Sequence, residues 1–358
     1  MDGMGGAHKN AVHRQSELPV SMTATTHPPT VFVTAPRLAP AGLQRLQAAH
    51  CRVLYLQDGG GEAEVAAVLA RESVDAVISR TATLSAAAIA ACPTLKVISK
   101  HGVGVSNIDV AAASQRGIPV YVTPGANAQA VAEMTLGLMF AAARRIAWMD
   151  AELRAGRWSR AQDGLELSGR TLGLLGFGQV GQRVARVALA LGMQVVAFDP
   201  AFDPAFDPAC APGPGAVAGV RMLGSVDELL PLSDVLSLHV PLNARTRHLL
   251  DAGRIAQLPR GALLVNTARG EVVNEAALID ALRSGHLAAA GLDTMAEEPL
   301  PAGHALAALD NVVLTPHVGG STPAALAAMA GMAAANVLGW LQGSPADPSH
   351  CVNPEVLR

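Results

Sequence analysis

Three polar side chains in the second half of the chain could together perform acid–base chemistry on an anionic substrate. Arg269 follows the segment LLVNTA, Glu298 follows GLDTMAE, and His317 follows VVLTP. The arginine fork matches a carboxylate in two hydrogen bonds, and an imidazole exchanges a proton near neutral pH. A carboxylate beside that imidazole would orient it. Taken singly, the three also suit a loop arginine, a surface glutamate and a helix-capping histidine.

A glycine-rich turn supplies a candidate nucleotide site. Residues 171–181, TLGLLGFGQVG, read as a strand that runs into a turn and then into a helix expected at 182–191. Gly176 allows the tight turn, Gly178 lets the backbone approach a pyrophosphate, and Gly181 permits close helix–strand packing. The helix N-terminus offers free N–H groups and a partial positive charge. The pattern therefore predicts a bound dinucleotide.

An acidic residue follows at the spacing that such a site requires. The strand Met193–Phe198 ends at Asp199, 18 residues after Gly181. A carboxylate there accepts hydrogen bonds from the adenosine ribose hydroxyls and repels a 2′-phosphate, which favours NAD over NADP. Asp203 and Asp207 repeat the same local sequence, so a different register is an alternative, but Asp199 fits the strand end best.

The same region contains an unusual repeat. Residues 198–209 read as three copies of Phe-Asp-Pro-Ala. Prolines at this spacing break both helix and strand, so the segment is predicted to be a loop insertion. It is either a tolerated surface expansion or a contact to the adenine end of the dinucleotide.

The rest of the chain predicts the elements that must position these side chains. Short β-branched runs alternate with alanine-rich segments of helical length, a pattern typical of an α/β fold with parallel sheets. A second unit of this kind is expected from Arg170 to about Leu314. The sequence predicts two doubly wound parallel-sheet domains with a cleft between them. In the first unit, strands are expected at 31–33, 52–56, 76–79, 95–99 and 119–122, and helices at 42–49 and 62–71.

Two long apolar helices are expected outside this alternation. The first spans Ala128–Ile146 and has apolar positions on more than one face, which is typical of a helix buried between domains or subunits. The second spans Pro323–Leu341 and follows the second unit, so it can pack back on the first unit. The chain would then cross between the domains twice. The ligand crevice is expected where the carboxyl ends of the strands meet.

The expected domain boundaries follow from this order. Residues 1–30, rich in His, Thr, Pro and Gly, form a disordered leader without an apolar signal core. Residues 31–126 plus 315–345 form the substrate (catalytic) domain, and residues 127–314 form the dinucleotide-binding domain. Residues 346–358 form a tail.

Composition excludes several classes of protein. The 358 residues carry a formal net charge of only -3, so neither a nucleic-acid-binding basic face nor an acidic tail is expected. No apolar run is expected to reach the roughly 18 residues that span a bilayer. The four cysteines are scattered without paired spacing, which argues against a metal site and a disulfide framework and favours the cytoplasm. They are Cys51, Cys92, Cys210 and Cys351.

Together these motifs resemble the D-isomer-specific 2-hydroxyacid dehydrogenase family, which includes phosphoglycerate dehydrogenases, hydroxypyruvate and glyoxylate reductases and D-lactate dehydrogenases. The resemblance covers about residues 31–342. It implies a flavodoxin-like substrate domain, a Rossmann NAD domain, and catalytic places for Arg269, Glu298 and His317. It implies that Asp293 accepts a hydrogen bond from the nicotinamide carboxamide. Other cofactor contacts implied by the resemblance are Val103, Gln179, Val180, Val240, Thr267, Ala268, Arg269, His317, Gly319 and Gly320.

A loop in the first unit resembles the family's substrate loop. It begins SKHGVGVSNID at Ser99, and Gly102 and Gly104 leave backbone N–H groups free to hold a carboxylate. Val103 and Arg269 are expected to be further substrate contacts. Lys100 and Arg80 fall where phosphoglycerate dehydrogenases often place basic side chains. If they bind the substrate, a phosphorylated acid is one candidate beside the unphosphorylated ones. Alternatively, both are solvated surface cations.

The function that follows is hydride transfer between NAD(H) and a small D-2-hydroxy acid or 2-oxo acid of the hydroxypyruvate, glyoxylate or 3-phosphoglycerate type. The resemblance also implies a homodimer formed through Ala128–Ile146. No nucleic-acid or membrane partner is expected. The alternative from another class is an NAD(H)-sensing scaffold or corepressor with little turnover. It would need a peptide groove that the sequence does not reveal.

Overall fold

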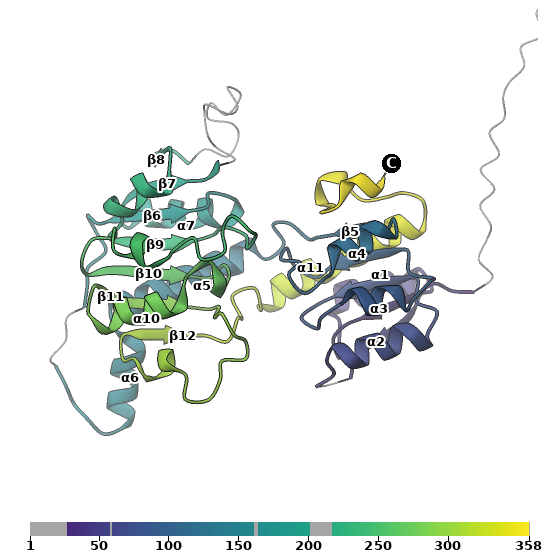
Figure 1. Ribbon diagram of the computed structural model, residues 1–358, viewed down its shortest axis with the longest axis horizontal. Coiled ribbons are helices and arrows are strands. Elements are labelled where there is room, and N and C mark those ends of the chain that lie inside the picture. Colours follow the sequence, from purple (N-terminus) through teal and green to yellow (C-terminus); the bar gives the residue numbers. More distant parts are fainter. Residues whose placement is uncertain (1–26, 58, 161–163, 201–216, 358) are drawn as a thin grey trace, which may run out of the picture.

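The structure is a computed structural model that describes residues 27–57, 59–160, 164–200 and 217–357. It contains two parallel sheets, each in a layered α/β domain (Figure 1). Residues 1–26 of the predicted leader lie outside the described residues. Most of the Phe-Asp-Pro-Ala repeat also lies outside them.

The first sheet has five parallel strands in the order β2-β1-β3-β4-β5. This order is the flavodoxin-like one, in which the chain reverses direction across the sheet between β1 and β3. Strands β1, β3 and β4 are buried along their whole length, as expected for a sheet covered by helices on both faces. The elements are β1 (Thr30–Val33), α1 (Pro40–Ala48), β2 (Arg52–Tyr55), α2 (Glu62–Arg71), β3 (Ala76–Ser79), α3 (Ala86–Ala90), β4 (Val97–Lys100), α4 (Val110–Gln115) and β5 (Val120–Tyr121).

The second sheet has seven parallel strands in the order β12-β11-β10-β9-β6-β7-β8. Counted from β6, this is the Rossmann order with one additional strand. The two sheets confirm the predicted fold class. The elements are β6 (Thr171–Leu175), α7 (Gln179–Ala190), β7 (Gln194–Phe198), β8 (Val220–Met222), α8 (Val226–Leu229), η3 (Leu230–Leu232), β9 (Val235–Leu238), α9 (Ala252–Ile255), β10 (Ala262–Asn266), η4 (Gly270–Val272), α10 (Glu275–Arg283), β11 (Leu287–Leu292), η5 (Ala305–Ala308) and β12 (Val312–Leu314).

The first long helix is shorter than predicted. Helix α5 spans Ala128–Ala143 and packs on β10, β11 and α7, and a separate helix α6 follows at Ile146–Arg154. Arg145 between them is left-handed, with φ 53°, and its guanidinium lies 4.4 Å from the centre of the Trp148 ring. The expectation of one helix from 128 to 146 was wrong because hydrophobic periodicity reports burial and not the backbone angle of one residue.

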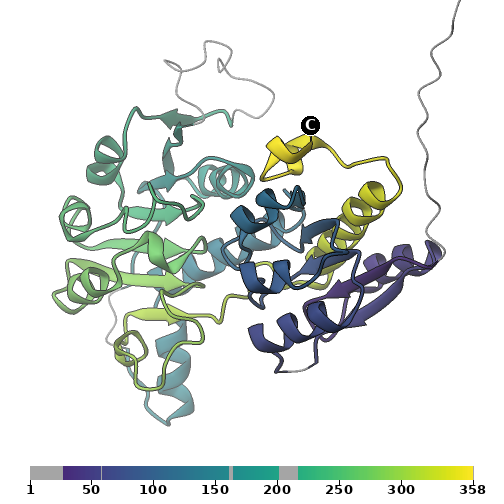
Figure 2. The same cartoon turned by 45° about the vertical axis from the view of Figure 1, so that its right-hand side comes forward.

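The C-terminal helix α11 (Pro323–Leu341) packs along α1, β3 and β4 of the first domain (Figures 1 and 2). Gly42 of α1 comes so close that a methyl group on it would lie 2.6 Å from the carbonyl oxygen of Ala330. The helix has 19 residues and a mean hydropathy of 1.6, so by length and composition it could cross a membrane, and the expectation of no such run was wrong. A helix packed within a domain passes the same test.

The segment expected to be a separate tail belongs to the first domain. Cys351 forms an antiparallel bridge with Tyr121, and Val352 N donates to Val120 O at 2.9 Å. The side chain of Asn353 accepts from Val120 N at 2.8 Å and donates to Ile118 O at 3.0 Å. These hydrogen bonds pair the backbone N–H and C=O groups of Val120 at the edge of β5. Sequence patterns missed this pairing because it joins residues more than 200 positions apart.

The chain crosses between the domains at 122–127 and at 315–322. The two crossings touch, since a methyl group on Gly320 would lie 2.9 Å from Nδ2 of Asn127. The candidate site residues lie next to this pair of crossings. They are found in the segments that follow β4 and β10 and in those that flank β12.

Candidate active site

Arg269 stands on a turn after β10 that its own neighbour fixes. The buried side chain of Asn266 accepts from Ala268 N at 3.0 Å and donates to the carbonyl of Arg269 at 2.9 Å. Burial lowers the pKa of Arg269, and the carboxylates of Glu298 and Glu271 oppose that shift. The guanidinium is therefore held in a partly desolvated place, where its contacts to an anion are strong.

Glu298 and His317 form a direct pair. Oε2 of Glu298 lies 2.8 Å from Nδ1 of His317, and Oε1 accepts from Met295 N at 3.0 Å. Partial burial raises the pKa of Glu298, but the hydrogen bonds from His317 and Met295 and the charges of His317 and Arg269 outweigh it, so the pKa lies below its usual value. Glu298 is therefore a carboxylate, and Nδ1 of the imidazole carries the proton between them. Among the described residues, Nε2 has no hydrogen-bond partner.

Asp293 holds the segment that carries His317. Its side chain is 2% exposed and accepts from Thr315 Oγ1 at 2.6 Å, Val318 N at 2.9 Å and Gly319 N at 2.8 Å. These bonds surround His317, whose φ of 53° is an uncommon left-handed conformation for a residue with a side chain. Strained backbone of this kind persists only where the surroundings over-determine it. The contact of Asp293 to a nicotinamide stays a prediction.

The substrate loop reaches across to Arg269. A methyl group on Gly104 would lie 1.7 Å from Nη2 of Arg269, so the loop backbone of the first domain touches the guanidinium of the second. The amide of Gly102 is not free as expected, because it donates to Thr123 Oγ1 at 2.9 Å. Among the described residues, the N–H groups of Val103 and Gly104 have no hydrogen-bond partner. The predicted anion nest stays a prediction, now for these two amides.

Lys100 is buried, so the alternative of a solvated surface cation was wrong for this residue. It is 9% exposed, and its Nζ donates to Asn107 Oδ1 at 2.5 Å and to the carbonyl of Arg80. Burial, followed by the charges of Arg269 and Arg80, lowers the pKa of Lys100 to about 7. Burial and the charge of Arg37 lower the pKa of Arg80 as well. Lys100 is therefore repelled by both Arg269 and Arg80, and a bound anion would relieve this repulsion.

The glycine turn fits a dinucleotide. Gly176 has a φ of 100°, and a methyl group there would lie 2.7 Å from the carbonyl carbon of His239. A methyl group on Gly181 would lie 2.5 Å from the carbonyl oxygen of Gly176, so the helix packs against the turn. Gly178 is the N-cap of α7, with no side-chain cap and open space around it. Helix α7 begins at Gln179, three residues earlier than predicted, and the N–H groups of its first turn have no partner in the part of the chain that the structure describes.

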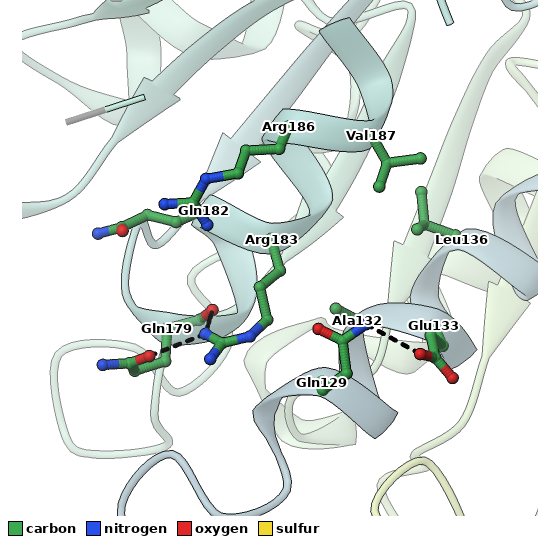
Figure 3. A pocket seen from close by; sticks show the side chains of 9 residues that line it. All are labelled: Gln129, Ala132, Glu133, Leu136, Gln179, Gln182, Arg183, Arg186 and Val187. Atoms are coloured by element: carbon green, nitrogen blue, oxygen red, sulfur yellow. Dashed lines mark hydrogen bonds between the residues drawn. The ribbon is translucent and has the colours of Figure 1, made fainter. Parts of the chain in front are cut away.

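The remaining cofactor positions lie around this turn. Asp199 accepts from Phe177 N at 2.8 Å, which places its carboxylate beside the turn at the end of β7. Val180 is the second residue of α7, and Val240 is buried after β9, next to Gly176. The side chain of Gln179 accepts from Nη1 of Arg183 at 2.8 Å on the outer side of α7 (Figure 3).

The positions after β10 and β12 lie between α5 and the crossings. Thr267 is buried, with its hydroxyl 2.8 Å from that of Thr135 on α5, which in turn donates to Val131 O. Ala268 accepts from Nη1 of Arg269 at 2.6 Å. Gly319, in the second crossing, donates to Asp293. The predicted cofactor positions of the second domain follow β6, β7, β9, β10 and β11. This edge of the sheet is where a doubly wound fold binds its ligand.

Sequence reasoning missed several polar residues that support the site. Asn266, Asn107 and His239 are among them. His239 lies half-buried behind the glycine turn, bonded to Ser237 Oγ at 3.0 Å, and burial lowers its pKa to about 4. Asn266 ends β10, His239 follows β9, and Asn107 lies in the substrate loop. A polar residue at the carboxyl end of an apolar strand is the signal that could have identified Asn266 and His239.

Metal ligation has no support in the described part of the chain. No group of three or more His, Cys, Asp or Glu side chains there could hold a metal ion. Cys51, Cys92 and Cys351 are free thiols, and Cys210 lies outside the described residues.

Comparison with known proteins agrees with this geometry. The sequence profile of the D-isomer specific 2-hydroxyacid dehydrogenase, NAD binding domain, matches residues 136–319. The chain is 40% identical to D-3-phosphoglycerate dehydrogenase of Methanocaldococcus jannaschii over 310 residues, which cover 83% of this chain and 57% of that protein. It is 45% identical to hydroxypyruvate reductase of Thermotoga maritima over 254 residues, which cover 70% and 79%. The chain thus spans little more than half the length of the first of these relatives.

A solved structure extends the similarity to both domains. The crystal structure of the TT0316 protein from Thermus thermophilus superposes with a TM-score of 0.79 at 39% identity, covering 90% of this chain and 99% of that chain. The profile match alone covers half of the chain, and it includes the glycine turn, Arg269, Glu298 and His317. By its sequence and by its fold, the chain belongs to the D-isomer-specific 2-hydroxyacid dehydrogenase family.

Proposed function

We propose that this chain transfers a hydride between NAD(H) and a small D-2-hydroxy acid or 2-oxo acid. The observation that carries the proposal is the arrangement of Arg269 against Gly104, with its charge acting on Glu298, which is hydrogen-bonded to His317. This arrangement combines a carboxylate-binding cation and an acid–base pair at the edge of a dinucleotide domain. Both relatives reported above are named as enzymes of this chemistry, a dehydrogenase and a reductase.

Each residue has a distinct task in the proposed reaction. A bound nicotinamide dinucleotide supplies the hydride in reduction and accepts it in oxidation. Arg269 and the amides of Val103 and Gly104 bind the substrate carboxylate and orient the 2-oxo group. His317 gives a proton from Nε2 to the carbonyl oxygen as it gains charge, and takes it back in the reverse direction. Glu298 holds the ring by Nδ1 and stabilises its protonated form.

Asp199 is the residue that would favour NAD over NADP. Its carboxylate lies at the end of β7 beside the glycine turn and would repel a 2′-phosphate. The change Asp199→Asn keeps an oxygen that can accept from Phe177 N but removes the charge. We expect the ratio of kcat/KM for NADH to that for NADPH to fall by about 10-fold or more, since one charge contact is worth at least about 1.4 kcal/mol. A ratio equal to that of the wild type would contradict this role.

The substrate is proposed to be one of three acids: glyoxylate, hydroxypyruvate or phosphohydroxypyruvate, the oxidised form of 3-phosphoglycerate. Lys100 and Arg80 beside the loop support an anionic group on the substrate besides the carboxylate that Arg269 binds. The test is NADH oxidation with each of the three acids and with pyruvate. Turnover of none of them, with NADH bound, would sink the proposed function and favour a protein that only senses the dinucleotide.

The domains are proposed to divide the work. Residues 31–126 plus 315–345 would bind substrate, and residues 127–314 would bind the dinucleotide. The free thiols of Cys51, Cys92 and Cys351 support a reducing compartment, and we propose the cytoplasm. Fractionation of cells that express the tagged protein tests this location.

A homodimer through α5 and α6 is also proposed. None of the nine residues of α6 is buried, and Ile146, Leu153 and Trp158 are largely exposed. So short a helix is marginal in water without a partner surface. A hollow of about 550 Å³ lies between α5 and α7, lined by apolar Leu136 and Val187 and by charged side chains (Figure 3).

Light scattering after size-exclusion chromatography tests the dimer. The change Leu153→Glu places a charge on the exposed side of α6 and is expected to give a monomer. The matched control is Leu232→Glu, which changes an exposed leucine outside α5 and α6. A wild-type chain that elutes as a monomer would reject the proposal.

A further inference from the structure

The loop that carries Glu298 has little packing to hold it. It leaves the sheet after β11, and the four residues from Ala296 to Pro299 are all exposed. A segment with few buried contacts opens easily unless polar contacts fix it. Glu298 must nevertheless stay within 2.8 Å of His317. The anchors of this loop therefore decide where the carboxylate stands.

Glu275, the first residue of α10, provides such an anchor at both ends of the loop. Its Oε2 accepts from Ala296 N at 3.1 Å, two residues before Glu298. Its Oε1 lies 3.1 Å from Nε2 of His304, six residues after Glu298. One carboxylate thus closes the loop from Ala296 to His304. Its side chain is only 20% exposed, so these contacts are partly shielded from water.

The hydrogen bonds of His304 fix the direction of the second contact. Nδ1 of His304 accepts from Leu306 N at 3.3 Å and therefore carries no proton. The ring proton is on Nε2, which donates it to Glu275. The contact needs no positive charge on the histidine, so the neutral ring forms it as well.

The same connection carries Arg269. A methyl group on Gly270 would lie 2.0 Å from the carbonyl carbon of Met295, so the turn after Arg269 packs directly on the backbone before Glu298. Glu275 follows five residues later and bonds to the next amide, that of Ala296. The β10–α10 connection therefore contacts the loop at two adjacent residues, Met295 and Ala296. It ties the position of the guanidinium to that of the carboxylate.

We infer that Glu275 is a positioning residue for the Glu298–His317 pair, acting by joining Ala296 and His304 across the loop. This inference rests on the proposed function for its effect on turnover, but not for its effect on the loop. The Glu275 carboxylate would then affect the reaction through the position of Glu298, without contacting substrate or cofactor itself. Removal of the anchor lets Glu298 move, and a displacement of about 1 Å at such a site lowers the rate by up to about 100-fold.

The test compares Glu275→Ala, Glu275→Gln and the control Asp280→Ala. Asp280 is an exposed acid on the same helix, and removing it changes the net charge equally. We expect Glu275→Ala to lower kcat by 10- to 100-fold, with the Kd of NADH within about 2-fold of the wild type. Glu275→Gln keeps an acceptor for Ala296 N and is expected to restore most of kcat. Asp280→Ala is expected to match the wild type.

Hydrogen exchange gives a reading that does not depend on turnover. In Glu275→Ala, the amides of residues 294–304 are expected to exchange at least 10-fold faster, while those of β10 and β11 are unchanged. If Glu275→Ala fails to fold, His304→Ala breaks the second contact without touching α10 and is expected to speed exchange in the same loop. Unchanged exchange in a folded variant overturns the inference, and so does a wild-type kcat where the wild type is active. A wild type that binds NADH without turnover sinks the proposed function alone, because the exchange result still stands.

Discussion

A methyl group on Gly104, in the loop of the first domain, would lie 1.7 Å from Nη2 of Arg269 in the second domain. We therefore expect Gly104→Ala to push the guanidinium from its place and to lower kcat/KM by about 10- to 100-fold, mainly through KM. Steady-state kinetics with the best substrate checks this. The control is Gly137→Ala on the exposed side of α5, where a methyl group meets nothing within 4 Å. Equal kinetics for both variants would show that the Gly104 contact has no role.

His317→Gln removes the proton donor and keeps a side chain that can hydrogen-bond. We expect kcat to fall by about 10²- to 10⁴-fold, the usual contribution of a positioned acid or base. The side chain is 42% exposed, so the free energy of unfolding should change little. Stopped-flow turnover and thermal unfolding of the same sample check the two statements. A variant that keeps a tenth or more of its activity would remove His317 from the proposed acid–base role.

Glu298 should keep the enzyme active in mildly acidic solution. Its folded pKa is below its ordinary value, so the carboxylate stays ionised down to pH values below about 4.5, and its contribution is lost only as pH falls through the lowered pKa. The midpoint of the loss of kcat/KM from this group should therefore lie below pH 4.5. The Glu298→Gln variant should lack this fall of kcat/KM on the acid side of the pH profile. Its kcat/KM should be lower at every pH, by up to roughly 10⁴-fold, which is the cost of losing an orienting carboxylate. An acid limb centred above pH 5 and absent from Glu298→Gln would contradict the lowered pKa.

Lys100 should make substrate binding depend on pH near neutrality. The pKa of Lys100 is lowered to about 7, so the amine is charged below that pH and loses its proton as pH rises through it. Burial lowers the pKa of the neighbouring His101 to about 4, so that ring stays neutral in this range. The KM for an anionic substrate is therefore expected to rise as pH passes 7.

Lys100→Arg provides the matching variant, because arginine keeps its charge. Its KM is expected to show no step near pH 7, and Lys100→Met is expected to show a high KM at every pH. Initial rates from pH 5.5 to 8.5 distinguish the three proteins. A wild-type KM that stays constant across this range would mean that Lys100 does not act on the substrate.

The sequence by itself determined the fold class and predicted the chemistry of the site. Strand–helix alternation, the glycine turn with Asp199 after it, and Arg269, Glu298 and His317 after apolar strands are local patterns. Such patterns depend on backbone sterics and on burial within one element, which a linear reading records. The broken helix at Arg145 was missed because one left-handed residue leaves no mark in hydrophobic periodicity.

Only the tertiary structure decided how these residues meet. It brought Gly104 against Arg269, bonded Asp293 to the amides around His317, used the amide of Gly102 for Thr123, and buried Lys100. It also joined Glu275 to both ends of the Glu298 loop. These contacts link residues up to about 165 positions apart. Their geometry depends on how the domains pack, and desolvation by that packing sets the pKa of Lys100, so no local pattern carries this information.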